Sequence, residues 1–166
     1  MKKISLSLLA LAGVLVTAES RAASINGVVN AEIVAPLEIV EDTQMDFGTL
    51  STDGTPETVV MDNAGSVTCP STMYCDGSTD AGVYTITGAP NGSVDVTVSD
   101  AVLSDGSGNT MSLTNDYGIK AGETLDGTGE LVINVGGELA VAGDQATGIY
   151  STSSVGGTAM TIDVNY

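Results

Sequence analysis

The sequence ends with AMTIDVNY (159–166), in which apolar and polar residues alternate from Met160 onward. Because successive side chains of a β-strand point to opposite faces, this pattern predicts a strand with one apolar and one polar face. The apolar face would carry Met160, Ile162, Val164 and Tyr166. Since the chain stops at Tyr166, we expect no later strand. A β-sandwich that lacks its final strand would expose a sheet edge and a strip of its core.

Short strand-like runs separated by tight-turn signals precede this ending. The turn signals are dipeptides whose residues tolerate positive φ: Asp53-Gly54, Asp76-Gly77, Asn91-Gly92, Asp105-Gly106 and Asp126-Gly127. The runs between them are 37–41, 45–50, 58–61, 66–69, 83–87, 94–99, 111–114, 131–135 and 138–141. This pattern predicts an all-β protein, an antiparallel and roughly immunoglobulin-like β-sandwich, with one domain over residues 37–166.

Residues 1–22 have the organisation of a signal peptide for secretion. Lys2 and Lys3 begin it, residues 6–16 form its apolar centre, and Ser20-Arg21-Ala22 provides a small-x-small cleavage site. A membrane anchor would need about 20 consecutive apolar residues, and this run ends near Thr17. We therefore expect cleavage and export from the cytoplasm.

The segment ASINGVVNAEIVAP (23–36) follows the signal and is named the leader below. In an extended conformation its apolar face would carry Ile25, Gly27, Val29, Ala31 and Ile33, with Asn26, Asn30 and Glu32 on the other face. Pro36 lacks an N–H and fixes its own φ, so it marks the joint with the body. Two interpretations remain open: the leader is a donor strand for a neighbouring subunit, or it is the first strand of its own domain.

The composition restricts the class of protein. The chain has 166 residues, enough for one domain with a real core, and it contains 21 Gly, one Phe and no Trp or His. Its net charge is −17; signal cleavage removes three bases and one acid, leaving Lys120 against 20 acids and a net charge of −19. Such an acidic surface excludes nucleic acid as a partner and disfavours anionic membranes. After cleavage no membrane-spanning segment is expected.

Cys69 and Cys75 lie close together in an exported chain, so they are expected to form a disulfide. The spacing is not Cys-x-x-Cys, and no His could complete a zinc site. The absence of His also removes the usual catalytic triads and the commonest general base. We therefore predict that the protein is not an enzyme and has no catalytic residues, cofactor or metal.

For the acidic residues near position 105, calcium binding is the main alternative to a role in forming the turn. Asp100, Asp105 and Asn109 surround a Gly-rich turn, and closely spaced oxygen ligands suit a hard cation. The stretch does not follow the twelve-residue EF-hand pattern, and an Asp in an Asp-Gly turn is explained by backbone geometry. Turn formation is the favoured interpretation.

Several segments in order resemble a known family. They are LEI (37–39), MDFGTL (45–50), LVINVGGEL (131–139), GIY (148–150) and VNY (164–166). Together they are similar to the bacterial domain of unknown function numbered 4402. The whole plan, with a signal, an alternating extension, an Asp-Phe-Gly element and a final strand ending in Tyr, also resembles chaperone-usher pilins and spore-coat-U-like fimbrial subunits. One departure is that those pilins carry Tyr second from the end and Gly fourteenth from the end, positions that here hold Asn165 and Ser153.

The pilin resemblance implies a filament subunit of a fimbrium with a role in cell adhesion. A periplasmic chaperone would hold the unfinished sandwich, and an outer-membrane usher would replace the chaperone with the leader of an identical or related subunit. The strand at 160–166 would form the edge of the receiving groove. The alternative is a self-contained secreted or surface sandwich, an adhesin or matrix component, whose leader pairs within its own sheet.

Overall fold

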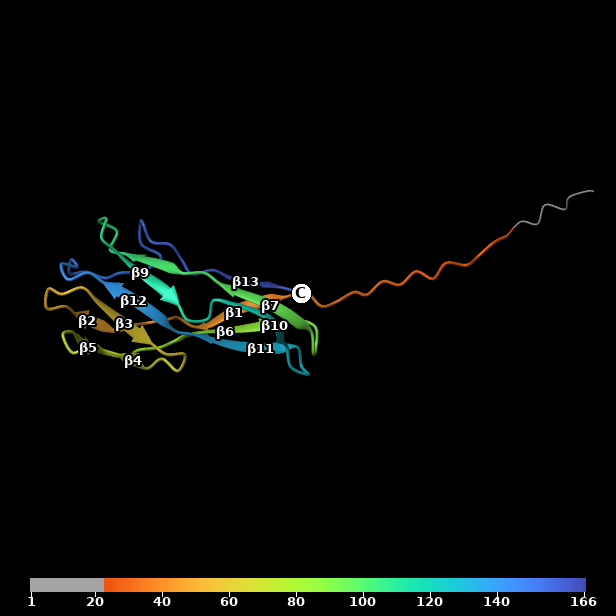
Figure 1. Ribbon diagram of the computed structural model, residues 1–166, viewed down its shortest axis with the longest axis horizontal. Helices are drawn as coiled ribbons and strands as arrows, with labels where there is room; N and C mark the ends of the chain where they lie inside the picture. The colour runs from red at the N-terminus through yellow and green to blue at the C-terminus, as the bar shows by residue number, and fades with distance from the viewer. Residues whose placement is uncertain (1–22) are drawn as a thin grey trace, which may run out of the picture. The chain divides into compact units, whose positions relative to one another are not determined.

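The computed structural model describes residues 23–166; the expected signal peptide at residues 1–22 lies outside this part. Residues 33–166 form one compact unit, and residues 23–32 fall outside it. All helices and strands assigned within residues 23–166 are β-strands (Figure 1). In the same residues no helix is long and apolar enough to cross a membrane.

Four antiparallel sheets make up the unit. The first contains β1 (Glu38–Thr43), β6 (Gly82–Thr87) and β11 (Glu130–Val135), and the second β10 (Ile119–Thr124), β7 (Ser93–Val98) and β13 (Ile162–Asn165). The third contains β4 (Val67–Thr68), β3 (Glu57–Met61), β12 (Gly137–Val141), β9 (Thr110–Asn115) and β8 (Ala101–Ser104). The fourth pairs β2 (Thr49–Ser51) with β5 (Tyr74–Asp76). The predicted all-β, antiparallel sandwich is confirmed.

Aliphatic side chains on alternating positions of these strands form two core clusters. The first cluster lies between the first and second sheets and contains Tyr84, Ile86, Val94, Val96, Val98, Leu125, Ile133 and Val135. The second lies under the five-stranded sheet and contains Phe47, Val59, Met61, Ala81, Ala101, Met111, Leu113, Leu139 and Val141. In β6 and β7 buried residues alternate with more exposed ones, as the period of a strand requires. Burial of these side chains is the main stabilising contribution to the sandwich.

The expected strand over residues 45–50 forms only in part. Its last residues belong to β2, whereas Asp46 makes an isolated bridge with Asp80 and Phe47 enters the core. Gly48 lies between them with a φ of 70°, a conformation outside the β region that interrupts the strand. The final expected strand, 159–166, is likewise reduced to β13.

The turn signals were mostly placed correctly. Gly54, Gly77, Asn91 and Gly106 have positive φ, as tight turns at these dipeptides require. In the fifth signal, Asp126-Gly127, the positive φ is found at Gly129 instead. The Asp126 carboxylate accepts hydrogen bonds from the backbone N–H groups of residues 128 and 130, so the acidic side chain organises this turn.

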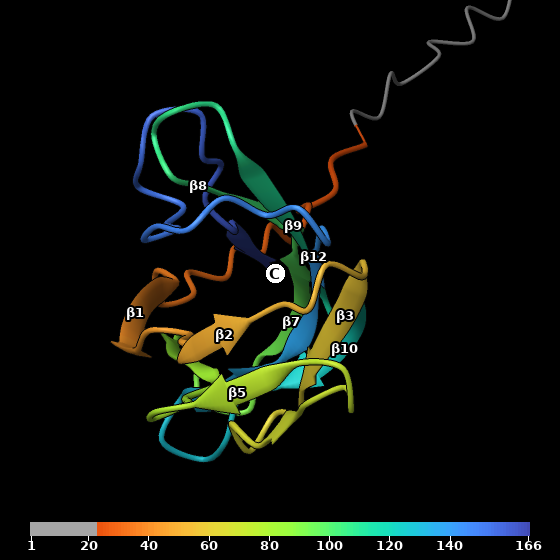
Figure 2. The ribbon, with the colours of Figure 1, turned by 90° about the vertical axis from the view of Figure 1, so that its left-hand side faces the viewer.

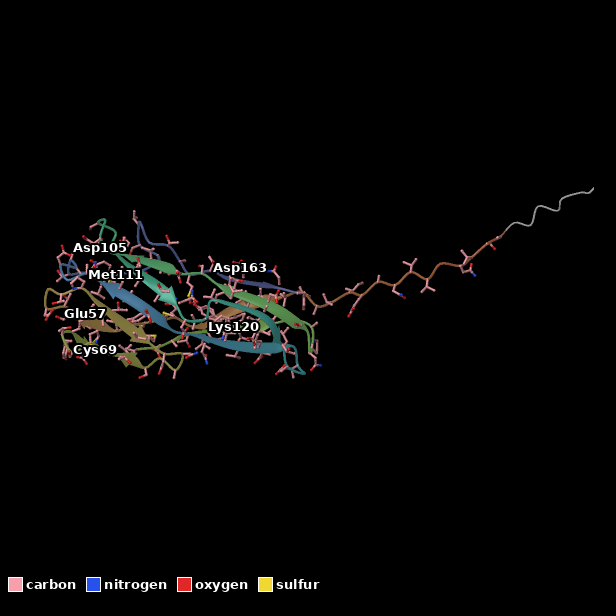
Figure 3. The ribbon with its side chains drawn as sticks, in the orientation of Figure 1. Glu57, Cys69, Asp105, Met111, Lys120 and Asp163 are labelled. Carbon is pink, nitrogen blue, oxygen red and sulfur yellow. A yellow bond between two sulfur atoms is a disulfide. The ribbon has the colours of Figure 1, made fainter. Side chains whose placement is uncertain are left out.

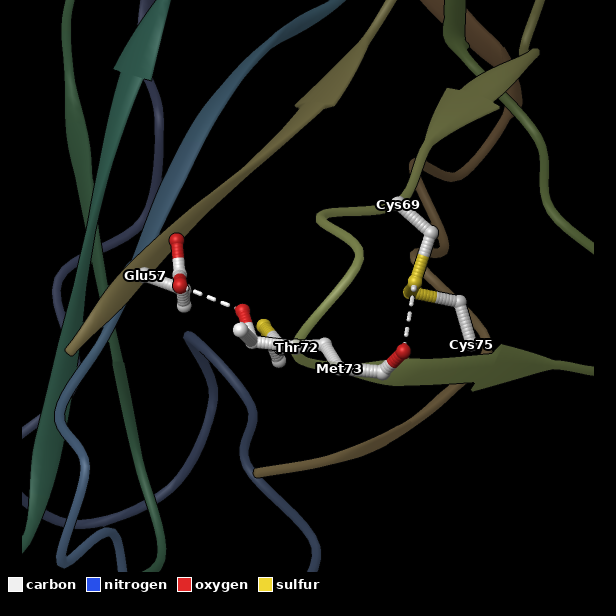
Figure 4. Close-up of a disulfide and its surroundings, with 5 residues drawn as sticks. All are labelled: Glu57, Cys69, Thr72, Met73 and Cys75. Atoms are coloured by element: carbon white, nitrogen blue, oxygen red, sulfur yellow. Dashed lines mark hydrogen bonds between the residues drawn. A yellow bond between two sulfur atoms is a disulfide. The ribbon is translucent and has the colours of Figure 1, made fainter. Parts of the chain in front are cut away.

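The predicted disulfide joins Cys69 and Cys75 and is confirmed, with an S–S distance of 2.01 Å (Figure 4). It closes the loop between β4 and β5. The hydroxyl of Thr72, in the same loop, donates a hydrogen bond to the carboxylate of Glu57 on β3. The disulfide and this bond together fasten the small β2–β5 sheet to the five-stranded sheet.

Candidate interaction groove

Among the strands at sheet edges in the folded unit, β1 and β13 border the same groove. Within residues 23–166, β1 pairs only with β6 and β13 pairs only with β7, so each stands at the edge of its sheet. An edge strand presents backbone N–H and C=O groups that another strand can pair with. Between these two edges lies a groove of about 560 Å³.

The groove has a mixed lining. Polar groups of Glu41, Gln44, Tyr84, Tyr150 and residues 151–153 form one part of it. The apolar part comes from β1, from the segment after it, from β8 and β9, and from β13 and its approach. It consists of Ile39, Met45, Phe47, Ala101, Leu103, Leu113, Ala159, Met160 and Ile162. In Figure 2, β8 lies above β1 and the two strands are separated in this view. The groove is therefore a place where the sandwich core reaches the surface.

A tyrosine and a glutamate supply a fixed polar contact in this lining. The Tyr84 hydroxyl, on β6, donates a hydrogen bond of 3.3 Å to the Glu41 carboxylate on β1. Burial, with the nearby charge and hydrogen bond of Glu41, raises the pKa of Tyr84 to about 12. Tyr84 is therefore a neutral donor at physiological pH. Its hydrogen bond fixes the side chain of Glu41, which lies on β1 at the edge of the groove.

On the other side of the groove, the segment before β13 is attached to β8 by backbone hydrogen bonds. Residues 151 and 158 each form an isolated antiparallel bridge with β8, at Ser104 and Val102. The buried Ser104 hydroxyl donates to the carbonyl of Val155 at 2.8 Å and accepts from the N–H of Gly106 at 3.1 Å. The segment that includes Tyr150 and residues 151–153 of the lining is thus fixed before any ligand binds.

Three of the four predicted residues of the final strand share one environment. Met160 and Ile162 line the groove, and like Val164 they pack against the first core cluster. Tyr166 lies one residue beyond β13, is 48% exposed, and is absent from the groove lining. Its predicted place at the edge of the groove stays a prediction. Its hydroxyl bonds to Ala89 and Ala35, as described below.

The predicted donor face of the leader is exposed. No strand is assigned to residues 23–37, and the exposed fractions of Ile25, Val29 and Ile33 are 95%, 92% and 98%. Gly27 has no atom within 4 Å of the Cβ position that an alanine would have, and Ala31 is also exposed. Three large aliphatic side chains at alternating positions are thus free of packing, which is unusual for residues of this kind.

The acidic residues weighed as calcium ligands make turn hydrogen bonds. The Asp105 carboxylate accepts from Ser107 N at 2.7 Å and from Asn109 Nδ2 at 2.6 Å, and these bonds lower its pKa. Asp100 instead accepts from Asn115. Among residues 23–166, no group of three or more His, Cys, Asp or Glu side chains is arranged to hold a metal ion. Figure 3 shows Asp105 in a different part of the body from Lys120 and Asp163.

These observations define an antiparallel β-sandwich whose core is open between two unpaired strand edges. Residues 37–166 match the family described as "Domain of unknown function (DUF4402)", and the chain belongs to this family. The match begins directly after Pro36, so it covers the body and leaves out the leader. No curated protein and no solved structure matches the chain.

Proposed function

We propose that this protein is a pilin-like structural subunit of an extracellular filament, without enzymatic activity, and that subunits join by donor-strand exchange. The observation that carries the proposal is the groove between the unpaired edges of β1 and β13, whose lining includes side chains of the core. An added strand can bond to an exposed sheet edge through its backbone while alternate side chains fill pockets. The leader of another subunit is the occupant with the matching pattern.

The sizes of the side chains of the leader support its insertion into the groove. From Ile25 to Ile33 an extended chain covers about 27 Å, which is longer than a six-residue strand such as β1. Large side chains at 25, 29 and 33 alternate with Gly27 and Ala31 on the same face. Such an alternation lets the backbone come close at the small residues while the large ones replace the missing core.

Charge favours the same pairing. The leader carries one ionisable side chain, Glu32, which an extended chain places on the face opposite Val29. The groove lining contains Glu41 as its only charged side chain, and Tyr84 already bonds to it. Insertion therefore buries no charge of the leader against the apolar lining, and the desolvation penalty of a buried charge is avoided.

An empty groove of this kind would promote aggregation before assembly. We therefore include in the proposal a periplasmic chaperone that covers the groove and an outer-membrane usher that exchanges it for a leader. The acidic body, in which Lys120 is the only basic residue after position 22, adds mutual repulsion that keeps subunits soluble.

The test is a comparison of two exported forms of the subunit, the full mature chain and the same chain without residues 23–35. The full chain is expected to form ladders that resist mild SDS, and the shortened chain is expected to remain monomeric. Circular dichroism of both forms checks that the body keeps its β-structure. Ladders that persist after the deletion would overturn the proposal. A full chain that is always monomeric would instead favour the self-contained surface protein.

A further inference from the structure

The hydroxyl group of the last residue ties two distant backbone segments together. Tyr166 Oη donates a hydrogen bond of 2.7 Å to the carbonyl oxygen of Ala35, and it accepts one of 2.7 Å from the N–H of Ala89. Ala35 directly precedes Pro36, the joint between leader and body, and Ala89 lies in the turn between β6 and β7. The C-terminus lies beside the start of the body in Figure 1.

Two glycines leave room for this ring. A Cβ at Gly88 would lie 2.6 Å from Tyr166 Oη and 2.8 Å from Leu37 Cδ2. A Cβ at Gly92 would lie 3.3 Å from Tyr166 Cε1 and 2.8 Å from the carbonyl of Ala89. Real Cβ atoms do not approach other atoms as closely as the Gly88 distances, so the position of Tyr166 depends on the absence of a side chain there.

The tie lies at the end of the body where a leader would have to turn to enter its own groove. β1 starts at Glu38 and β13 ends at Asn165, so Tyr166 holds the first residues of one edge to the last residues of the other. The groove lies farther from Tyr166. It extends forward along β1 from Ile39 and backward along the chain from Ile162 to Met160. For a subunit to complete itself by the shortest route, its chain must reverse between Ala35 and Glu38 and run back along β1.

The sequence itself would permit such a reversal. Proline is favoured at the second position of type I and type II turns, and a turn over residues 35–38 would place Pro36 there. That turn is closed by a hydrogen bond from the N–H of Glu38 to the carbonyl of Ala35. In the structure this carbonyl accepts from Tyr166, and no turn is assigned to residues 33–37.

We propose that Tyr166 is a positioning residue that prevents the subunit from filling its own groove, so that the leader is available only to another copy of this chain. The inference rests on the proposed function. Its hydroxyl competes with the turn at residues 35–38 that would return the leader along β1.

The test is Tyr166→Phe in the full mature chain, because it removes the hydroxyl and keeps the ring. Of the two hydrogen bonds that this change removes, only the bond to Ala35 opposes the turn, and its loss is expected to shift the ratio of self-completed monomer to ladder about fivefold toward monomer. This monomer should not bind a labelled peptide with the sequence of residues 23–36, and its melting temperature should be higher than that of the wild-type monomer with an empty groove. Tyr74→Phe is the matched control, since Tyr74 is 62% exposed and its hydroxyl bonds only to Asp76; it should leave the ratio unchanged.

The possible failures are distinguishable. If wild-type ladders depend on the leader but Tyr166→Phe leaves the ratio unchanged, the positioning role is overturned and the proposed function stands. A lower melting temperature with full binding of the peptide would show that Tyr166 only stabilises the body, which also overturns the inference. If the wild-type ladders do not depend on the leader, the proposed function fails first.

Discussion

Two adjacent valines of the leader provide a matched pair of substitutions. Val28 and Val29 are 86% and 92% exposed, so replacing either one by alanine should leave the folded body unchanged. In an extended leader they point to opposite faces. Donor-strand insertion buries Val29 with the Ile25 and Ile33 face and leaves Val28 on the outer face.

The size of the effect follows from the atoms removed. Val→Ala deletes two carbon atoms, and each buried methyl or methylene group contributes about 0.8 kcal/mol. Val29→Ala should therefore weaken the joint between subunits by about 1.6 kcal/mol, which corresponds to about fifteenfold faster dissociation if association is unaffected. Val28→Ala should change the dissociation rate by less than about twofold, as expected of a side chain that stays in solvent.

The assay measures the rate at which purified ladders break down to monomer in SDS at one fixed temperature. The wild type and both variants are followed side by side, and the melting temperature of each monomer provides the control for the folded body. Equal rates for the two variants, or a larger effect of Val28→Ala, would refute the assignment of the inserted face.

Three further predictions concern the body. Replacing both Cys69 and Cys75 by serine opens a loop with a sequence separation of 6, and chain entropy predicts a loss of about 2 kcal/mol in the free energy of unfolding, measured by urea denaturation; an unchanged value would contradict the entropic reasoning. Hydrogen bonds to its carboxylate lower the pKa of Asp126, so its contribution to stability is complete above the ordinary value of 3.8 and is lost as the pH falls through the lower folded value. Asp126→Asn should make the free energy of unfolding depend less steeply on pH at acid pH. An unchanged pH dependence would contradict the proposed contribution of Asp126. Because the pKa of Tyr84 is raised from 10.0 to about 12, its contribution to stability is lost as the pH rises across that interval; ultraviolet titration of wild type and Tyr84→Phe should differ by one late phenolate transition, and a transition near the ordinary value would disprove it.

Much of the sandwich could be predicted from local patterns. β6 and β11 are rich in β-branched residues, alternate in burial, and were expected almost at their observed bounds. Three strands were missed for physical reasons. β10 contains Lys, Ala, Gly and Glu, which have weak strand preferences, and it forms because it pairs with β7. β8 follows β7 after only two residues, and β5 is a short strand next to the disulfide.

The sequence led us to expect a groove beside the final strand, but it did not identify most of the residues that line it. Met160 and Ile162 were expected at its edge, while Ala101, Leu103 and Leu113 were not connected with it. Their strands reach the groove through pairings between residues distant in sequence, which alternation cannot reveal. A useful signal was present in the two apolar runs separated at Ser99-Asp100, which indicate two strands instead of one.

Tyr166 shows the limit of alternation in a different way. The period of a strand predicts that it points inward with Ile162 and Val164, but β13 ends at Asn165. Beyond the strand, the ring follows the space left by Gly88 and Gly92 and the bonds offered by Ala35 and Ala89. The contacts of the Tyr166 ring come from segments that are far apart in the sequence, so no local sequence pattern predicts them.

The most direct measurement determines whether the leader enters the groove of its own chain or that of another subunit. A photo-crosslinking amino acid is placed at position 29, and subunits with heavy and light isotopes are mixed before assembly and then irradiated. Mass spectrometry of the products should show position 29 joined to groove residues around Met160, with heavy and light peptides linked to each other. Crosslinks to the groove that always join peptides of the same isotope would show that each chain fills its own groove, and donor-strand exchange between subunits would be disproved.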